Sequence, residues 1–542
     1  MAAARWYDCN TMSKATRHER VERARLRAAG LDDSDLPADA RRELRRTLSK
    51  VELLDDIRRD IASWSAKSVM EYLTAEARDI PPFLIARVVR EVSGTSGTTA
   101  PTPKQIQQLA HRLLNAFDPA LARRLGGDFS EVAIGRLIAS QLLTQREFTF
   151  DLVPAAHILF DPTTASPIGP GAWEQLLGVD FRQFVLLVRP LAHSLSRSPV
   201  NLRRYLDGTP RSVATATHNI VELLIGNVDE LRAAATARTP VDPSDEIYDH
   251  GPLLQLPLYS RADGRIATAS PEYLMLATSP PGLYIRLIQA DHADGTRARS
   301  QAVGDRFGTY LHRYARGGLP SDWIVRKVDD EPPPYDGTKI ADLAIWPSDR
   351  SWLLIIEGKA TLQHEHAQLG HDDARRRMAD LYQESFDQID STYTAVGTRG
   401  FLSDAPTGAP TFGLTVTLEP HITTVRDGAT HPGYVLGYRE PTGHSAQGKY
   451  VQSRMLSAAM FEVLIDAGSW ATPEQHLGIL NRVFAASDIR QIRSHVHDEV
   501  GTVPDGAPLN PLVGEAFELL VDGVGDEAIA ARLREIAHEG LN

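Results

Sequence analysis

The residues of this chain with the clearest potential for chemistry are two acids and a lysine, Asp342, Glu357 and Lys359. Glu357 and Lys359 follow the apolar run 351–356, which is bounded by turn residues and predicts a strand buried on both faces. Side chains two apart on a strand point to the same face, so this acid and this lysine should lie together. Gly358 between them would face the other way and let another element approach closely.

Asp342 is expected to reach the same place from a neighbouring strand. Residues 346–350 contain Pro, Ser and Asp and predict a turn, so residues 340–345 become the first strand of a hairpin. Two carboxylates at the ends of paired strands could hold Mg²⁺ or Mn²⁺, hard ions that prefer carboxylate oxygens and keep several waters. The ion would neutralise charge on a phosphodiester, and the lysine could position the attacking water. The alternative is that Glu357 and Lys359 form an ordinary surface ion pair.

At these positions the sequence resembles the PD-(D/E)xK nuclease superfamily, which has the restriction-endonuclease-like fold. Asp342 matches the strand aspartate, Glu357 the second acid and Lys359 the lysine, while Ala341 stands where the family name has proline. The resemblance covers about residues 250–420. It implies a Mg²⁺-dependent endonuclease that hydrolyses phosphodiester bonds of DNA.

The family usually supplies one more acid from a helix before the first core strand, in a Gly-x-x-Phe-Glu-x-Tyr pattern. Gly304, Phe307 and Tyr310 fit this pattern, but Gly308 stands in place of the glutamate. Asp305 lies three residues earlier, close to one helical turn, and is the candidate metal ligand that would compensate. The alternative for Asp305 is an acid in the first turn of a helix, where the helix dipole favours negative charge.

A helix is predicted after the lysine, over about residues 373–396, because its apolar residues recur at helical spacing. Several family members carry a glutamine on this helix that points back into the site. Gln388 is the best match here and Gln383 a weaker one. A solvent-facing polar position is the alternative.

The formal net charge of −12 is awkward for an enzyme of nucleic acids, because binding draws on Lys and Arg that neutralise phosphates. A local basic patch can coexist with an acidic total. One candidate is the basic segment 14–27. Another is the run Arg375, Arg376 and Arg377 at the start of the predicted helix, since arginine side chains bind phosphate oxygens. A solvated helix face is the alternative interpretation of both.

The composition is that of a soluble globular protein, with 42% hydrophobic and 24% charged residues. The single cysteine, Cys9, excludes a disulfide framework and fits a reducing cytosol. His364 and His366 lack zinc-site spacing and predict a polar loop. There is no apolar run of membrane-span length and no apolar signal core, so we expect a cytoplasmic protein without a membrane partner.

The expected fold class is multidomain α and α/β, with a restriction-endonuclease-like α/β core between helical regions. The regions are a helical N-terminal region 1–95, a helical domain 104–238, a nuclease-like α/β domain 246–440 and a helical C-terminal region 450–542. Residues 93–103 are rich in Gly, Ser, Thr and Pro and predict a linker. Inside the α/β domain, residues 252–271 predict a hairpin that turns at Asp263-Gly264, and residues 411–418 predict a later core strand.

Three functions are compatible with this pattern. The first is the DNA nuclease, for which defence of a bacterium against foreign DNA is a role suggested by fold-level analogy. The second is a catalytically degenerate nuclease fold that binds nucleic acid or scaffolds a complex, and Gly308 favours it. The third is a helical interaction protein. The chain has no nucleotide-binding loop motif, so an ATPase partner would be a separate chain. A partner protein and a second copy of the chain are further expected partners.

Overall fold

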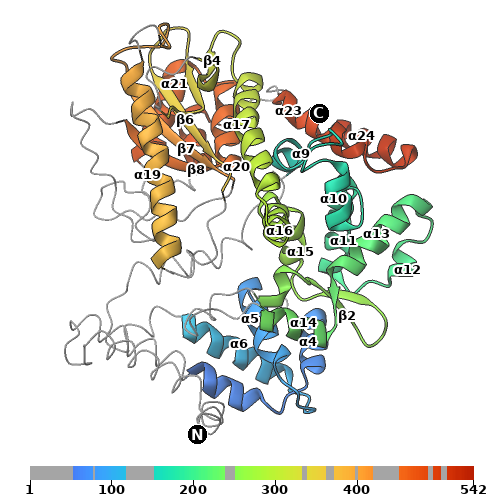
Figure 1. The fold of residues 1–542 in the computed structure, drawn as a ribbon. Helices are drawn as coiled ribbons and strands as arrows, with labels where there is room; N and C mark the ends of the chain where they lie inside the picture. Colours follow the sequence, from blue (N-terminus) through green and yellow to red (C-terminus); the bar gives the residue numbers. More distant parts are fainter. Residues whose placement is uncertain are drawn as a thin grey trace, which may run out of the picture. The chain divides into compact units, whose positions relative to one another are not determined.

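The computed structural model describes residues 53–76, 80–117, 152–237, 251–331, 339–361, 372–396, 401–418, 451–485, 492–501 and 509–541. This part of the chain is mostly helical and contains a three-stranded and a five-stranded sheet, so the protein combines α and α/β structure (Figure 1). Contacts divide it into two units. Unit 1 comprises Met1–Arg146, Pro190–Asp207 and Val221–Met275, and unit 2 comprises Glu147–Arg189, Gly208–Ile220 and Leu276–Asn542.

Unit 1 is built from amphipathic helices and a small sheet. Proline occupies the first position of α5, where its missing N–H costs nothing, and almost every residue of this helix is buried. Ile106, Leu109 and Leu113 recur at helical spacing on α6 and are all buried, so they form its apolar face. The elements are α4 (Ala66–Glu76), α5 (Pro82–Ser93), α6 (Pro103–Phe117), α12 (Leu202–Tyr205), β1 (Ile225–Gly226), α14 (Val228–Ala237), η3 (Gly251–Leu254), β2 (Leu258–Ser260) and β3 (Ile266–Thr268).

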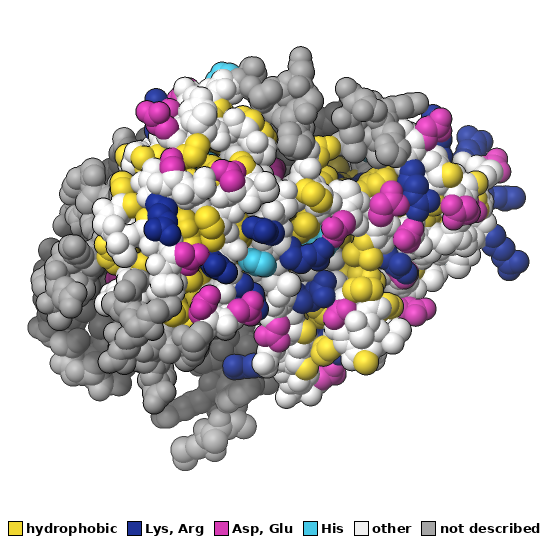
Figure 2. Space-filling model, turned by 90° about the horizontal axis from the view of Figure 1, so that it is seen from above, with side chains coloured by type: hydrophobic (Ala, Val, Ile, Leu, Met, Phe, Trp, Pro, Cys, Tyr) yellow, Lys and Arg dark blue, Asp and Glu magenta, His cyan; other side chains and the backbone are white. Residues whose placement is uncertain are grey.

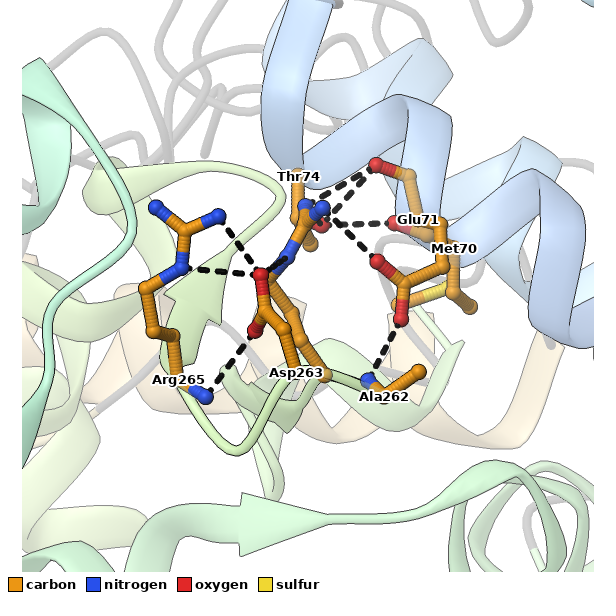
Figure 3. A network of polar contacts seen from close by, with 7 residues as sticks. Met70, Glu71, Thr74, Ala262, Asp263 and Arg265 are labelled. Carbon is orange, nitrogen blue, oxygen red and sulfur yellow. Dashed lines mark hydrogen bonds and ion pairs between the residues drawn. The ribbon is translucent and has the colours of Figure 1, made fainter.

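The hairpin predicted at Asp263-Gly264 is confirmed. Strands β2 and β3 pair antiparallel, with Leu258 opposite Thr268. Both are shorter than expected, and η3 occupies the residues expected to begin the first strand. Gly264 has a φ of 76°, a left-handed conformation that favours glycine. Glu71 of α4 holds the turn by accepting from the backbone N–H of Ala262 at 2.8 Å (Figure 3).

The segment 93–103 is tied by hydrogen bonds to residues 63–65 and is not the free linker that its composition predicts. Thr95 is buried and its hydroxyl donates to the carbonyl of Trp64 at 2.9 Å. The backbone of Thr99 exchanges hydrogen bonds with Ser63 and Ser65. A Cβ on Gly97 would lie 2.0 Å from the carbonyl carbon of Ser63. The prediction is wrong because glycine and threonine serve here for close backbone approach and buried hydrogen bonding, uses that composition does not reveal.

The five-stranded sheet of unit 2 has the order β4-β5-β6-β7-β8. Strands β4, β5 and β6 pair antiparallel, while β6, β7 and β8 pair parallel. The predicted hairpin is β5–β6, and the predicted later strand is β7, so both predictions are confirmed. The strands are β4 (Ile324–Lys327), β5 (Leu343–Trp346), β6 (Leu353–Lys359), β7 (Thr411–Thr417) and β8 (Gln452–Ser457).

Two helices cover the two faces of β6, with α17 (Ala298–Gly318) and α19 (Asp372–Ala395) on either side of the sheet in Figure 1. Leu353 and Ile355 form a buried cluster with Tyr382, Phe386 and Ile389 of α19. The opposite face lies against α17 at Gly358, as described below. Because both faces of β6 are covered, its sequence before Glu357 is continuously apolar and does not alternate between apolar and polar residues.

The C-terminal region does not begin as a helix. Strand β8 extends the sheet, and its Met455 and Leu456 are buried. The prediction failed there because a six-residue strand that pairs with a distant parallel neighbour leaves little periodic signal. Helices follow as predicted. The remaining helices with residues in unit 2 are α9 (Leu152–Ile158), α10 (Pro170–Leu177), α11 (Phe181–Arg197), α13 (Arg211–Leu224), α15 (Pro271–Thr278), α16 (Pro280–Ala293), η4 (Val328–Asp330), α20 (Ala458–Gly468), α21 (Pro473–Ala485), α22 (Ile492–Val500), α23 (Pro511–Val521) and α24 (Glu527–Leu541).

Among the described helices, none has the length and apolar character needed to cross a membrane.

Candidate active site

The acid and the lysine at the end of β6 lie on the same face of the strand and touch. Glu357 is only 2% exposed, and its Oε1 lies 2.7 Å from Nζ of Lys359. The strand continues through both residues, which pair with Thr415 and Thr417 of β7. A buried ion pair at this depth is unlike the exposed pairs of protein surfaces, so the surface interpretation of these two residues is wrong.

Gln388 of α19 completes the contact group. Its Oε1 accepts from Lys359 Nζ at 2.8 Å, and its Nε2 donates to the carbonyl of Ile340 at 3.2 Å. Both ends of the amide are therefore used, which holds the side chain towards the lysine. Gln383, the weaker candidate, instead donates to Asp387 of the same helix at 2.6 Å. A solvent-facing position for Gln388 is thus excluded.

Asp342 stands immediately before β5 and is tied to β6 through the backbone. Its Oδ2 accepts from the N–H of Gly358 at 2.7 Å, and its own carbonyl accepts from Val328 N at 2.8 Å. The preceding residue, Ala341, donates its N–H to the hydroxyl of Thr392 on α19 at 2.8 Å. These bonds fix the aspartate at the open end of the hairpin, next to Gly358, the residue between Glu357 and Lys359.

Gly358 faces α17, as its position between two residues of the opposite face requires. A Cβ there would lie 2.8 Å from Cδ1 of Leu311, 3.0 Å from Oδ2 of Asp342 and 3.2 Å from Cδ1 of Phe307. Real Cβ contacts are longer than this, so glycine allows both the helix and the aspartate to approach the strand. The sequence prediction of a close approach at this glycine is confirmed.

Gly308, which stands where the resemblance expects a glutamate, also lies beside the aspartate. A Cβ on Gly308 would be 3.8–3.9 Å from the carboxylate atoms of Asp342. This is ordinary van der Waals distance, so the position has room for a side chain. A glutamate at position 308 would therefore leave α17 beside Asp342, where this chain has only the hydrogen atom of a glycine.

Asp305 is exposed on α17, and no contact joins it to the other candidates. Helix α17 begins at Ala298, so Asp305 lies about two turns inside it, and the alternative of a first-turn acid is wrong. Within the described ranges, no set of three or more His, Cys, Asp or Glu residues is placed to hold a metal ion. The carboxylates that the structure does bring to this end of the hairpin are Asp342 and Glu357.

Two charged residues near the site were missed by the sequence analysis. Nζ of Lys339 lies 2.5 Å from Oε1 of Glu384, which is one helical turn before Gln388 on α19. The hydrogen bond from Lys339 lowers the pKa of Glu384, and the charge of Lys359 contributes. The spacing of four residues between Glu384 and Gln388 was the available signal, because such residues share a helix face.

Several candidates lie outside what the structure describes. Helix α19 includes the backbone of Arg375, Arg376 and Arg377, but their side chains lie outside the described residues, as do His364 and His366 and the basic segment 14–27. On the face drawn in Figure 2, basic and acidic side chains are interspersed among the described residues. Any attraction for nucleic acid there would rest on local groups rather than on one broad positive field.

Comparisons of the chain with protein-family models, with curated proteins and with solved structures found no match.

Proposed function

We propose that the protein is a metal-dependent nuclease that hydrolyses phosphodiester bonds of DNA. The observation that carries this proposal is the contact group at the end of β6, in which the buried Glu357 binds Lys359 and Gln388 of α19 binds the same lysine. Asp342 is hydrogen-bonded to the residue between them. A buried acid, a lysine and a second acid with fixed positions are the groups that metal-assisted hydrolysis of a phosphodiester requires.

The chemistry of the two acids suits a hard divalent cation. Asp342 and Glu357 offer carboxylate oxygens, and Glu357 already binds a cationic group, the ammonium of Lys359. A bound Mg²⁺ or Mn²⁺ would supply charge stabilisation at the phosphate, with further ligands from water and substrate. Lys359 would hold the attacking water or the developing negative charge, and Gln388 would keep the lysine in place.

The order of elements supports the finer assignment of a restriction-endonuclease-like core. A helix that carries the Gly304, Phe307 and Tyr310 pattern, α17, precedes the core strands. The hairpin β5–β6 bears the acids, α19 follows the lysine with its glutamine, and β7 pairs parallel to β6. These are the positions that the sequence resemblance assigns to the nuclease core.

Gly308 favours a second candidate function, a degenerate nuclease fold that binds nucleic acid or scaffolds a complex without cutting. The glycine faces Asp342 at a distance where a glutamate would add a carboxylate. Without it, the described site has two acids, and its affinity for a metal ion would be lower. In this second function, the Glu357–Lys359–Gln388 group keeps its structure, but the protein does not cleave nucleic acid.

The decisive experiment is cleavage of plasmid and linear DNA by the purified chain with Mg²⁺, Mn²⁺ or EDTA. The nuclease predicts metal-dependent cutting that falls by about a hundredfold or more in Asp342→Ala and in Lys359→Ala. Lys339→Ala is the matched control, because it removes an exposed lysine near the site but leaves the contact group intact. Cutting that survives in both site variants would refute the assignment.

If the wild-type chain does not cleave DNA, the same assay distinguishes the nuclease from the degenerate nuclease fold. Gly308→Glu would place a carboxylate beside Asp342, and Gly308→Gln is the neutral control of the same shape. Metal-dependent cutting gained by the glutamate variant alone would assign the wild type to the degenerate class. Silence in all variants would remove the support for a nuclease site.

A further inference from the structure

Unit 1 contains a cavity of about 400 Å³. It is open to solvent on one side and is lined by residues of the segment 53–62, by the C-terminal end of α5 with the residues that follow it, and by α14. Its volume lies in the range of about 300–1,000 Å³ that small-molecule sites occupy. All of its lining residues belong to unit 1, so it is separate from the candidate active site of unit 2.

The charged side chains of the lining are mostly positive. They are Arg58, Arg90, Arg232 and Glu91. Burial raises the pKa of Glu91, but the charges and hydrogen bonds of the arginines outweigh it, so the pKa is lowered and the group is ionised at neutral pH. Arg58 Nε lies 2.8 Å from Glu91, and Arg87 lies 3.3 Å from it. Three arginines against one glutamate leave the lining with an excess of two positive charges.

Two of the arginines, Arg58 and Arg232, are held in place by the protein. Nε of Arg232 donates to the carbonyl of Ser93 at 2.8 Å, and its Nη2 donates to the carbonyl of Thr95 at 3.0 Å. Two charged residues outside the lining pair with residues of the lining: Asp229 lies 2.6 Å from Arg232, and Arg87 lies 3.3 Å from Glu91. The negative charge of Asp229 and the positive charge of Arg87 cancel. A ligand would therefore meet preorganised cations and would not have to order them, which favours binding.

The rest of the lining combines hydroxyl groups with an apolar wall. Ser96 and Thr236 are exposed at the cavity, while Ala62 and Ala235 provide hydrocarbon surface, with the buried Ile61 behind them. Arginine and hydroxyl groups bind phosphate oxygens, and the apolar wall suits the organic part of a ligand. We propose that this cavity binds a small organic phosphate, with its phosphate at the arginines and its organic part against the apolar wall.

Titration calorimetry of the full chain with AMP, ribose 5-phosphate and adenosine tests the proposal. At least one of the two phosphate esters should bind with one site per chain, and adenosine should not. If neither ester binds at millimolar concentration, or if adenosine binds as tightly as the esters, the proposal is overturned. Binding that weakens as salt is raised is the further expected result, because the attraction is electrostatic.

A pair of variants then locates the ligand. Ala235 lies on α14 at the cavity, and Ala235→Glu would introduce a negative charge, while Ala235→Gln adds nearly the same bulk without charge. The glutamate should weaken binding of the phosphate ester by about tenfold or more, and the glutamine by much less. Thermal melting shows whether both variants fold. Equal losses in the two variants, or no loss in either, would overturn the role assigned to the arginines.

Discussion

Two hairpins of this protein carry the same short pattern, an acid, a glycine and a base, and use it differently. In unit 1, Asp263-Gly264-Arg265 forms the turn between β2 and β3, where the acid and the base are 39% and 45% exposed. In unit 2, Glu357-Gly358-Lys359 ends strand β6, where the acid is almost fully buried. The first pattern closes a turn and the second forms the candidate active site.

The difference lies in the surroundings of each pattern. Around the first, Figure 3 shows a network of polar contacts in which Glu71 of α4 binds the turn at Ala262. Arg261 adds an ion pair with Glu71 and a hydrogen bond to Thr74. Around the second, Lys359 donates to Gln388, Gly358 donates its N–H to Asp342, and Glu357 is almost out of reach of solvent. Exposed ion pairs contribute little to stability, while a buried pair constrains its neighbours strongly. An acid-x-base pattern therefore suggests chemistry only where the strand that bears it is buried.

The largest expected contrast comes from removing the base of each pattern. Lys359→Met takes the ammonium away from a buried carboxylate and should lower the free energy of unfolding by about 2–4 kcal/mol at neutral pH. Arg265→Met removes an exposed partner and should leave the urea midpoint almost unchanged. Urea denaturation of both variants and the wild type measures this. Equal midpoints for the two variants would show that burial is not what separates the hairpins.

Acid should act on the second hairpin through His476. The ring of this residue stacks on Trp352, the residue before β6, and meets Trp323 edge-on, with ring centroids 5.2 Å apart in both pairs. Burial lowers its pKa to about 3. In the unfolded chain the pKa is near 6.5, so stability is complete above that pH and is lost as pH falls towards 3. At pH 4.5 the loss is about 2–3 kcal/mol relative to pH 8.

The variant His476→Phe should remove this part of the pH dependence. Asp263→Asn, in the first hairpin, should leave it as in the wild type, because that carboxyl is exposed. Burial raises the pKa of Asp466 to about 6, which acts in the opposite direction, so each variant is compared with the wild type at the same pH. An unchanged difference between pH 8 and pH 4.5 in His476→Phe would contradict the assignment.

The smallest effects should come from the two glycines, where the same substitution destabilises the protein for two different reasons. Gly358→Ala should cost about 1–3 kcal/mol, because its Cβ would press on Leu311, Phe307 and Asp342. Gly264→Ala should cost about 1–2 kcal/mol, because its φ of 76° disfavours a side chain although the space is open.

Asparagine distinguishes crowding from backbone strain. It tolerates the left-handed conformation, so Gly264→Asn should recover part of the loss seen in Gly264→Ala. Gly358→Asn should be worse than Gly358→Ala, because the larger side chain meets the same neighbours. Chemical denaturation of the four variants checks both orders, and the same order at both glycines would mean that one cause acts at both.

Local patterns predicted the parts of the site that lie on one element. The apolar run before Glu357 predicted a buried strand, and the spacing of Glu357 and Lys359 predicted their common face. The helical spacing of the apolar residues in 373–396 predicted the buried side of α19, whereas Gln388 was singled out by the family resemblance and not by a local pattern. Strand β8 and the packing of residues 93–103 were not predicted, because both depend on partners distant in the chain.

What the sequence determined by itself is the periodicity of each element, and with it which side chains share a face. Only the tertiary structure decided which faces meet. It placed Gly308 opposite Asp342, bound Gln388 to Lys359, and brought Arg58, Arg90 and Arg232 around one cavity. The physical reason is that backbone geometry repeats over a few residues, whereas these contacts arise from the packing of helices and strands that are far apart in the chain.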